Sequence, residues 1–265
     1  MRADLHTHSK FSDGSSSIEE VAKIGVEKGL DIIAITDHDT VAHMRSLPIN
    51  ESLRIVMGIE ISAIHKQSNI KAHILGYNIS KPDIVESLTL PLLKARHSNT
   101  EKQAEILISH GYYIDYDKLP RGEEPYLYKV HLMDWFVATK QADEMYGEFY
   151  YEVFKNNGIC DIDIEYIDVF DAVKVIKEAG GLAVLAHPGQ QQNYFLIPDL
   201  VDIGLAGIEI NHYAHNEKDR EIIRDYASRF SLFLTGGSDF HGRYSDKSNV
   251  GDYLSEDSGI RAICG

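Results

Sequence analysis

The sequence has few cysteines, no long hydrophobic run and no basic leader. Cys160 and Cys264 are the two cysteines among 265 residues, and they form no Cys-x-x-Cys pair. Their scarcity excludes a thiolate zinc site and fits a reducing compartment. No stretch of about 18 apolar residues occurs, and no basic segment followed by an apolar one opens the chain. We therefore expect a cytoplasmic protein without a membrane span.

Positive charge is also scarce. Lys and Arg number 26 against 41 Asp and Glu, which gives a formal net charge of −15. This balance argues against an extended surface that binds nucleic acid through its phosphates. An anionic ligand would need a local positive centre instead. The 13 histidines are numerous for this length, so their positions matter.

Short β-branched runs alternate with segments of helical period, which is typical of an α/β fold with a parallel sheet. Two helices have clear ends: residues 17–29 begin with a Ser17 and Glu20 capping box, and residues 168–181 end in Gly180 and Gly181. The predicted strands are residues 3–5, 32–36, 55–60, 72–76, 182–186, 207–210 and 232–235.

The alternation is interrupted between residues 79 and 167, where the sequence is mostly helical and rich in tyrosine and charge. This stretch could simply supply long barrel helices. Because no convincing strand occurs over such a length, we favour an inserted helical subdomain, residues 79–167, within a barrel built from residues 1–78 and 168–265.

Each predicted strand ends in ionisable residues. In parallel α/β folds the carboxyl ends of the strands carry the chemistry, so these residues should meet at one face. A single histidine pair such as His6 and His8 would be weak support, because a solvated terminal strand gives the same pattern. The repetition favours a multinuclear metal site built from imidazoles and carboxylates. In chain order the residues are His6, His8 and Asp13; Asp37, His38 and Asp39; Glu60; His73; His187; Glu209, His212 and His215; Asp239 and His241.

These motifs resemble, in order, those of the polymerase and histidinol phosphatase (PHP) superfamily of metal-dependent phosphoesterases. The matching segments are HTH at 6–8, TDHD around His38, GIE at 58–60, KAHILGY around His73, AHPG at 186–189 and GSDFHG at 237–242. The resemblance spans nearly the whole chain. It implies a distorted seven-stranded (β/α)7 barrel with an inserted helical subdomain.

The resemblance also implies a trinuclear site of divalent metal ions, for which Mn²⁺, Fe²⁺ and Zn²⁺ are equally suitable. Asp37 is expected to orient a histidine rather than to bind metal. In this implied scheme the first ion is held by His6, His8, Glu60 and Asp239. The second ion is held by His73, His187 and the same Glu60, which bridges the two ions. The third ion is held by Asp13, His38 and His241.

Four further residues are expected to bind the substrate's phosphate. Lys129 and His131, in YKVHL, stand where the family commonly has Arg-Pro-His, so an ammonium replaces a bidentate guanidinium. Arg96 and His215 also match substrate-facing positions of the family. For both, a solvated surface role is nearly as well supported.

Within the family the chain looks most like stand-alone enzymes that hydrolyse nucleoside 3′,5′-bisphosphates or trim short RNA from its 5′ end. The implied reaction is phosphoester hydrolysis by a metal-activated water without a protein nucleophile, on a small anionic nucleotide or short oligonucleotide. Two alternatives stay open: histidinol-phosphate phosphatase, and a non-catalytic metal-binding module. The sequence does not identify the native ion or the oligomeric state.

Overall fold

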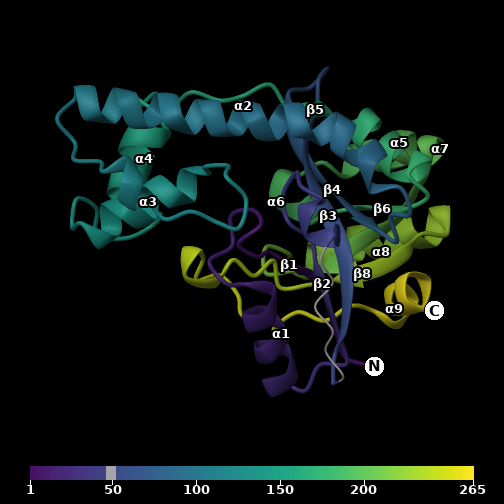
Figure 1. Cartoon of the computed structure of the whole chain (residues 1–265). Coiled ribbons are helices and arrows are strands. Elements are labelled where there is room, and N and C mark those ends of the chain that lie inside the picture. The colour runs from purple at the N-terminus through teal and green to yellow at the C-terminus, as the bar shows by residue number, and fades with distance from the viewer. Residues whose placement is uncertain (46–51) are drawn as a thin grey trace.

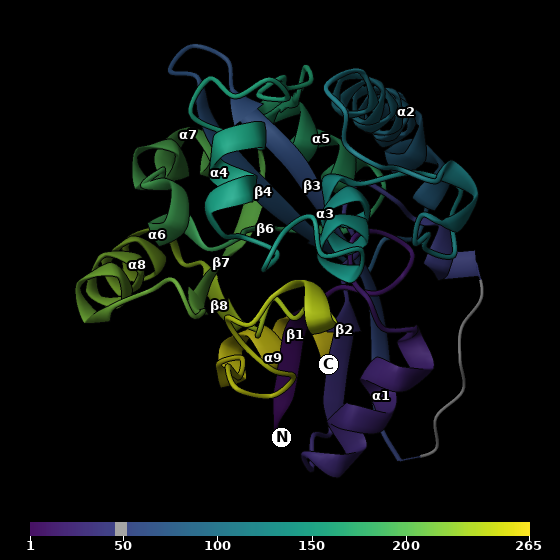
Figure 2. The same cartoon turned by 90° about the vertical axis from the view of Figure 1, so that its left-hand side faces the viewer.

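A curled, mixed β-sheet forms the centre of the computed structural model, which describes residues 1–45 and 52–265 (Figures 1 and 2). Seven strands follow the order β1-β2-β3-β4-β6-β7-β8, and β5 pairs with β3 off this path. All seven predicted strands are present. The strands are β1 (Ala3–Thr7), β2 (Ile32–Ile35), β3 (Arg54–His65), β4 (Ile70–Tyr77), β5 (Ile167–Asp168), β6 (Leu182–Leu185), β7 (Leu205–Asn211) and β8 (Phe233–Gly236).

The two ends of the sheet approach each other. Thr7 forms a parallel bridge with Phe240, just beyond β8. In addition, the backbone N–H of Asp239 donates to the His6 carbonyl at 2.8 Å, and that of His8 donates to the Phe240 carbonyl at 2.9 Å. The expected distorted β/α barrel is therefore confirmed, and its near-closure brings the first and last motifs of the chain together.

The strand directions correct one prediction. β1, β2 and β3 are mutually parallel, as are β6, β7 and β8, but β4 runs antiparallel to both β3 and β6. The expectation of a parallel sheet is wrong at β4. Only residues 66–69 connect β3 to β4, and a parallel crossover needs a dozen residues or more, so the two strands form a hairpin.

Both predicted helices are present. Ser17 and Glu20 form the expected capping box of α1 (Ile18–Glu27). Asp168, which was not predicted as a cap, accepts from the Phe170 backbone N–H at the start of α5 (Val169–Glu178). Gly29 follows α1 in a left-handed conformation with φ 66°, which favours glycine. The other helices are α2 (Pro82–Ser109), α3 (Lys129–Ala138), α4 (Glu148–Phe154), α6 (Pro188–Gln191), α7 (Ile197–Ile203), α8 (Glu217–Phe230) and α9 (Asp257–Cys264).

Helices α2, α3 and α4 follow β4 and precede β5 in the chain, and they extend to one side of the sheet (Figure 1). They enclose an apolar cluster of their own, which includes Trp135, Phe136 and Phe154. The Tyr128 hydroxyl joins this region to the barrel by donating to the His38 carbonyl at 3.0 Å. The division into a barrel (1–78 and 168–265) and an inserted subdomain (79–167) stays a prediction.

Among the helices in residues 1–45 and 52–265, none is both long enough and apolar enough to cross a membrane.

Candidate metal centre

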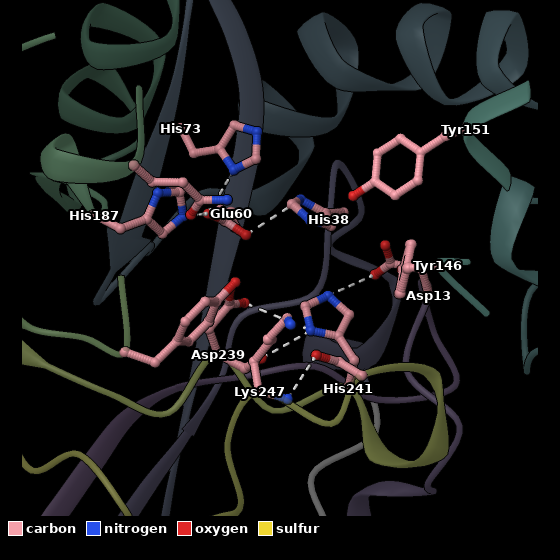
Figure 3. Close-up of a pocket in the computed structure, with 13 residues that line it drawn as sticks. Asp13, His38, Glu60, His73, Tyr146, Tyr151, His187, Asp239, His241 and Lys247 are labelled. Carbon is pink, nitrogen blue, oxygen red and sulfur yellow. Dashed lines mark hydrogen bonds and ion pairs between the residues drawn. The ribbon is translucent and has the colours of Figure 1, made fainter. Parts of the chain in front are cut away.

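Imidazoles and carboxylates from several strand ends converge at one end of the barrel (Figure 3). His6 and His8 share a face of the chain because their side chains are two residues apart at the end of an extended strand. Glu60 reaches the same point from β3, and Asp239 from the segment after β8. All four are buried. Burying so many charged groups is unfavourable unless they are paired or bind a cation.

The first group has the dimensions of a coordination sphere. His6 Nε2 lies 3.3 Å from Glu60 Oε2 and 3.4 Å from Asp239 Oδ1. His8 Nε2 lies 3.2 Å and 3.1 Å from the same two oxygens, and 3.2 Å from His6 Nε2. Ligand atoms about 2.1 Å from one ion are about 3.4 Å apart in a tetrahedron and about 3.0 Å in an octahedron. The donor set therefore fits a divalent ion.

The other oxygen of Glu60 faces a second group. Glu60 Oε1 lies 2.9 Å from His73 Nδ1 and 2.9 Å from His187 Nε2. One carboxylate thus faces two clusters of imidazoles with different oxygens. This is the arrangement that a carboxylate bridging two ions requires.

A third group surrounds Asp13. Asp13 Oδ1 lies 3.4 Å from His241 Nε2 and 3.8 Å from His8 Nδ1. His38 belongs to this group too, although its Nδ1 lies 3.3 Å from Glu60 Oε2. All nine residues expected to bind metal are therefore assembled at one place, while their division among three ions stays a prediction.

Two buried atoms of this cluster, His8 Nδ1 and Glu60 Oε2, form no hydrogen bond within the described residues. Burial lowers the pKa of His8, but Asp239 and Glu60 outweigh it and raise that pKa to about 10. Burial opposes ionisation of Asp239 and Glu60, yet the histidines hold both carboxyl pKa values well below their usual range. The carboxylates and the imidazoles thus stabilise each other's charged forms, and a bound cation would take the place of the proton on His8.

Glu209 and His212 complete the centre, and the predicted ligand set omitted both. Glu209 Oε1 lies 3.0 Å from His6 Nδ1, and its Oε2 accepts from the His187 backbone N–H at 2.9 Å. His212 Nε2 lies 3.3 Å from Asp239 Oδ2. The signal for them was the sequence IEINH, which places Glu209 near the end of β7 and His212 directly after it. Glu209 is placed to orient His6 and to select its tautomer.

Asp37 supports the centre differently from the expectation. Its carboxylate accepts from the Ser9 backbone at 2.8 Å, the Ser9 hydroxyl at 2.6 Å and the Ser12 hydroxyl at 2.6 Å. These bonds fix the loop between His8 and Asp13. The histidine near Asp37 is His43, at 3.8 Å, which is not one of the nine.

The residues expected to bind phosphate do not line the cavity at the centre. An Arg96 guanidinium nitrogen donates to Asp39 Oδ2 at 2.6 Å and to the Ser62 hydroxyl at 2.9 Å. His215 Nδ1 lies 2.8 Å from the Ile210 carbonyl, and its Nε2 accepts from the Gly189 N–H at 3.1 Å. These contacts occupy both nitrogens of His215 and one terminal nitrogen of Arg96, whereas the buried Arg96 Nε has no hydrogen-bond partner within the described residues.

Lys129 and His131 have internal contacts as well. The Lys129 ammonium lies 5.4 Å from the centre of the Phe154 ring, where burial and nearby Lys155 lower its pKa to about 8. His131 Nδ1 accepts from the Tyr128 N–H at 3.1 Å, and burial lowers the pKa of His131 to about 4. The role of these residues in substrate binding stays a prediction.

A cavity of about 370 Å³ opens over the cluster. This volume lies at the small end of the range typical of ligand pockets. In Figure 3 the Tyr151 hydroxyl points toward His38. Besides seven of the expected metal-binding residues, the lining consists of Tyr146, Tyr151, Gln190, Tyr213, Ser245 and Lys247.

Comparison with known proteins agrees with this architecture. The model of the PHP domain family matches residues 4–183. The chain belongs to the PHP domain family. The chain is 41% identical over 257 residues to the phosphoribosyl 1,2-cyclic phosphate 1,2-diphosphodiesterase of Eggerthella lenta, covering 95% of this chain and 98% of that relative.

Two other members show how far the likeness extends. The 3′,5′-nucleoside bisphosphate phosphatase of Chromobacterium violaceum is 25% identical over 260 residues, which is 94% of this chain and 90% of that protein. A crystal structure from Bifidobacterium adolescentis, of a protein assigned to the metal-dependent phosphoesterases, superposes with a TM-score of 0.86 at 26% identity, covering 98% of this chain and 94% of that one. This PHP protein is a metal-dependent phosphoester hydrolase.

Proposed function

We propose that this PHP protein hydrolyses the cyclic phosphodiester of a phosphorylated sugar of the phosphoribosyl 1,2-cyclic phosphate class. The observation that carries this proposal is the 41% identity to the Eggerthella lenta diesterase, which extends over 95% of the chain. The nucleoside bisphosphate phosphatase of similar length is only 25% identical. A cavity of about 370 Å³ is also well matched to a single sugar phosphate.

In this proposal the three groups around Glu60 and Asp13 hold divalent ions. Such ions, when bound, lower the pKa of water and neutralise phosphate oxygens. The proposal uses no covalent nucleophile from the chain: the Thr36 hydroxyl donates to the Thr7 carbonyl at 3.2 Å, and Ser238 is fully buried. A water oxygen forms the new bond to phosphorus and releases a proton, the bond between phosphorus and one of the two sugar oxygens of the cyclic phosphate breaks, and that sugar oxygen takes up a proton.

Tyrosine hydroxyls around the cavity are suited to hold the sugar. Burial raises the pKa of both Tyr146 and Tyr213 above the usual range, so both phenols stay protonated at neutral pH. A protonated phenol donates a hydrogen bond to a sugar or phosphate oxygen. We assign Tyr146, Tyr213 and Gln190 to orienting the sugar relative to the metal-binding groups.

A comparison of three substrates with the manganese-loaded protein tests the proposal. Phosphorus NMR would follow phosphoribosyl 1,2-cyclic phosphate, a nucleoside 3′,5′-bisphosphate and histidinol phosphate. We expect kcat/KM to be at least about tenfold higher for the cyclic ester, a difference of about 1.4 kcal/mol in transition-state binding. A Glu60→Gln protein in parallel excludes contaminating phosphatases. Higher kcat/KM for either other substrate contradicts the proposal, as does inactivity on all three with metal bound.

A nucleoside 3′,5′-bisphosphate or short RNA is the second candidate substrate. The resemblance of the ordered motifs to bisphosphate phosphatases and the match to the Chromobacterium violaceum enzyme support it. Both candidates are small phosphoesters that carry a second phosphate group.

A further inference from the structure

One charged residue in the cavity lining is outside the candidate metal-binding set. Among the lining residues in the described part of the chain, Lys247 carries the one fixed positive charge, and the others outside that set are tyrosines, a glutamine and a serine. Figure 3 shows Lys247 on the side of the cavity formed by Asp239 and His241. A permanent cation beside a centre that already attracts anions indicates a second anionic group on the ligand.

The segment that carries Lys247 is anchored on both sides. Arg243 donates to the two Asp134 carboxylate oxygens at 3.2 Å and 2.6 Å, which ties this segment to α3. Ser248 donates its hydroxyl to the Ser238 carbonyl, beside Asp239. Between these anchors, the Lys247 N–H donates to the Ser245 hydroxyl at 3.4 Å. Its backbone is therefore positioned before any ligand arrives.

The ammonium of Lys247 has only a weak competing partner. Its Nζ lies 3.8 Å from Asp246 Oδ1, and the two side chains are 61% and 92% exposed. Exposed pairs of this kind contribute little, because both charges remain hydrated. A phosphate dianion can thus displace Asp246 without loss of a strong internal contact.

Space for such a group exists next to Lys247. A second cavity, of about 210 Å³, shares Tyr146, Ser245 and Lys247 with the cavity over the metal-binding groups. Arg243 lines this second cavity too, but Asp134 neutralises it. Glu144 and Asp246 line it as well, so the position available to an anion is the shared wall at Lys247 and Ser245.

We propose that Lys247, together with the Ser245 hydroxyl, binds the non-reacting phosphate of a substrate with two anionic groups, while the metal-binding groups hold the reacting phosphoryl. This proposal rests on the proposed function and specifies its substrate class: phosphoesters with a second phosphate. An ammonium is a compact charge suited to phosphate. Lys247 takes the role that the sequence assigned to Lys129.

The test compares substrates with and without the second phosphate. For the Lys247→Ala protein we expect kcat/KM on phosphoribosyl 1,2-cyclic phosphate to fall by about ten- to a hundredfold, the range of a charged hydrogen bond, mainly through KM. Hydrolysis of ribose 1,2-cyclic phosphate should change by less than about twofold, since it lacks the contacted group. Lys247→Arg should restore most of the loss. Equal losses on both substrates, or no loss on either, overturn the proposal.

Lys174→Ala is a matched control. Lys174 Nζ lies 3.7 Å from Asp171 Oδ1, with side chains 51% and 57% exposed, on helix α5. Its removal takes away the same charge in a similar exposed pair and should leave both substrates unaffected. A loss equal to that of Lys247→Ala would assign the effect to overall charge and overturn the proposal.

A second comparison distinguishes failure of the proposed function from failure of the phosphate site at Lys247. If the unaltered protein hydrolyses nucleotides instead of cyclic sugar esters, the same comparison uses a nucleoside 3′,5′-bisphosphate against the nucleoside 3′-monophosphate. A Lys247→Ala loss confined to the bisphosphate supports the phosphate site although the cyclic-ester assignment fails. Equal losses on both nucleotides overturn the phosphate site as well.

Discussion

Glu209 contacts the His6 nitrogen that points away from the metal-binding groups. Glu209 Oε1 lies 3.0 Å from His6 Nδ1, while His6 Nε2 faces Glu60 and Asp239. The contact joins β1 to β7 across a separation of 203 residues. A carboxylate in this position keeps Nε2 of the imidazole free for a metal ion and increases its basicity. The two residues therefore act together on the candidate metal centre.

Glu209→Gln should weaken metal binding without unfolding the protein. Loss of such an orienting carboxylate typically costs about ten- to a hundredfold in metal affinity. Manganese titration of the metal-free protein would measure the change, with circular dichroism to check the fold. Glu217→Gln, on the exposed start of α8, is the control and should bind manganese normally. Unchanged affinity in Glu209→Gln would show that His6 needs no orienting partner.

Glu60→Gln should have a larger effect, because both Glu60 oxygens face imidazoles within 3.3 Å. An amide supplies one neutral oxygen where the centre presents two charged ones. We expect metal content to fall and kcat to drop by more than about a hundredfold, beyond the range for residues that only orient ligands. Elemental analysis after dialysis and steady-state kinetics would measure both. Full metal content with normal kcat would contradict a bridging role.

Metal affinity should rise with pH. Burial lowers the pKa of His8, but Asp239 and Glu60 raise it to about 10, so metal-free His8 keeps a proton at neutral pH. A metal ion must displace that proton, and raising the pH toward 10 removes the competition. We expect up to about tenfold tighter manganese binding per pH unit between about pH 6.5 and about pH 8.5, with proton release on binding. Titrations in two buffers of different ionisation enthalpy would detect it, and a pH-independent affinity without proton release would contradict it.

Arg96→Met should destabilise the protein. It leaves the fully buried Asp39 carboxylate without the guanidinium that contacts it at 2.6 Å. Removing one partner of a buried pair costs about 3–5 kcal/mol. Urea unfolding of the metal-saturated protein would measure the loss, and the double variant Arg96→Met with Asp39→Asn should recover part of it. Retained stability in Arg96→Met, with reduced kcat/KM, would instead support the phosphate-binding role expected from the sequence.

Lys129→Met should stabilise the protein and leave kcat/KM within about twofold. Burial and Lys155 lower the pKa of Lys129 from 10.5 to about 8, so its charge disfavours folding at neutral pH and stability rises as pH increases from 8 toward 10.5. Removing the charge should increase the unfolding free energy by about 1–3 kcal/mol and abolish that pH dependence. Denaturant unfolding across this range would measure both, and a large rise in KM would show that Lys129 contacts substrate.

The sequence predicted the centre well because the ligand candidates lie within or directly after predicted strands, although Glu60 and His73 lie inside the longer β3 and β4 of the structure. His6, Glu60 and Asp239 are far apart in the chain, yet strand position alone brought them to one face. The direction of β4 could not be predicted, because it depends on the length of the connection between β3 and β4. The predicted strands left residues 61–71 for this connection, whereas the longer observed strands leave only residues 66–69.

The substrate-facing residues could not be located from local pattern. Lys247 and Tyr146 lie in irregular segments whose course over the cavity depends on distant contacts such as that between Arg243 and Asp134. Lys129 and Arg96, by contrast, are helical residues whose inward or outward direction is set by tertiary packing. Functional side chains near strand ends can be located from the sequence pattern, whereas functional side chains on irregular segments cannot.

The hairpin of β3 and β4 also affects the order in which the centre can assemble. It places His73 beside Glu60, a separation of 13 residues, whereas His6 meets Glu209 across 203 residues. Loop-closure entropy grows with the logarithm of length, so the longer closure costs about 2–3 kcal/mol more. A folding chain can therefore form the Glu60–His73 pair from local contacts alone, and the remaining imidazoles join only when the barrel closes.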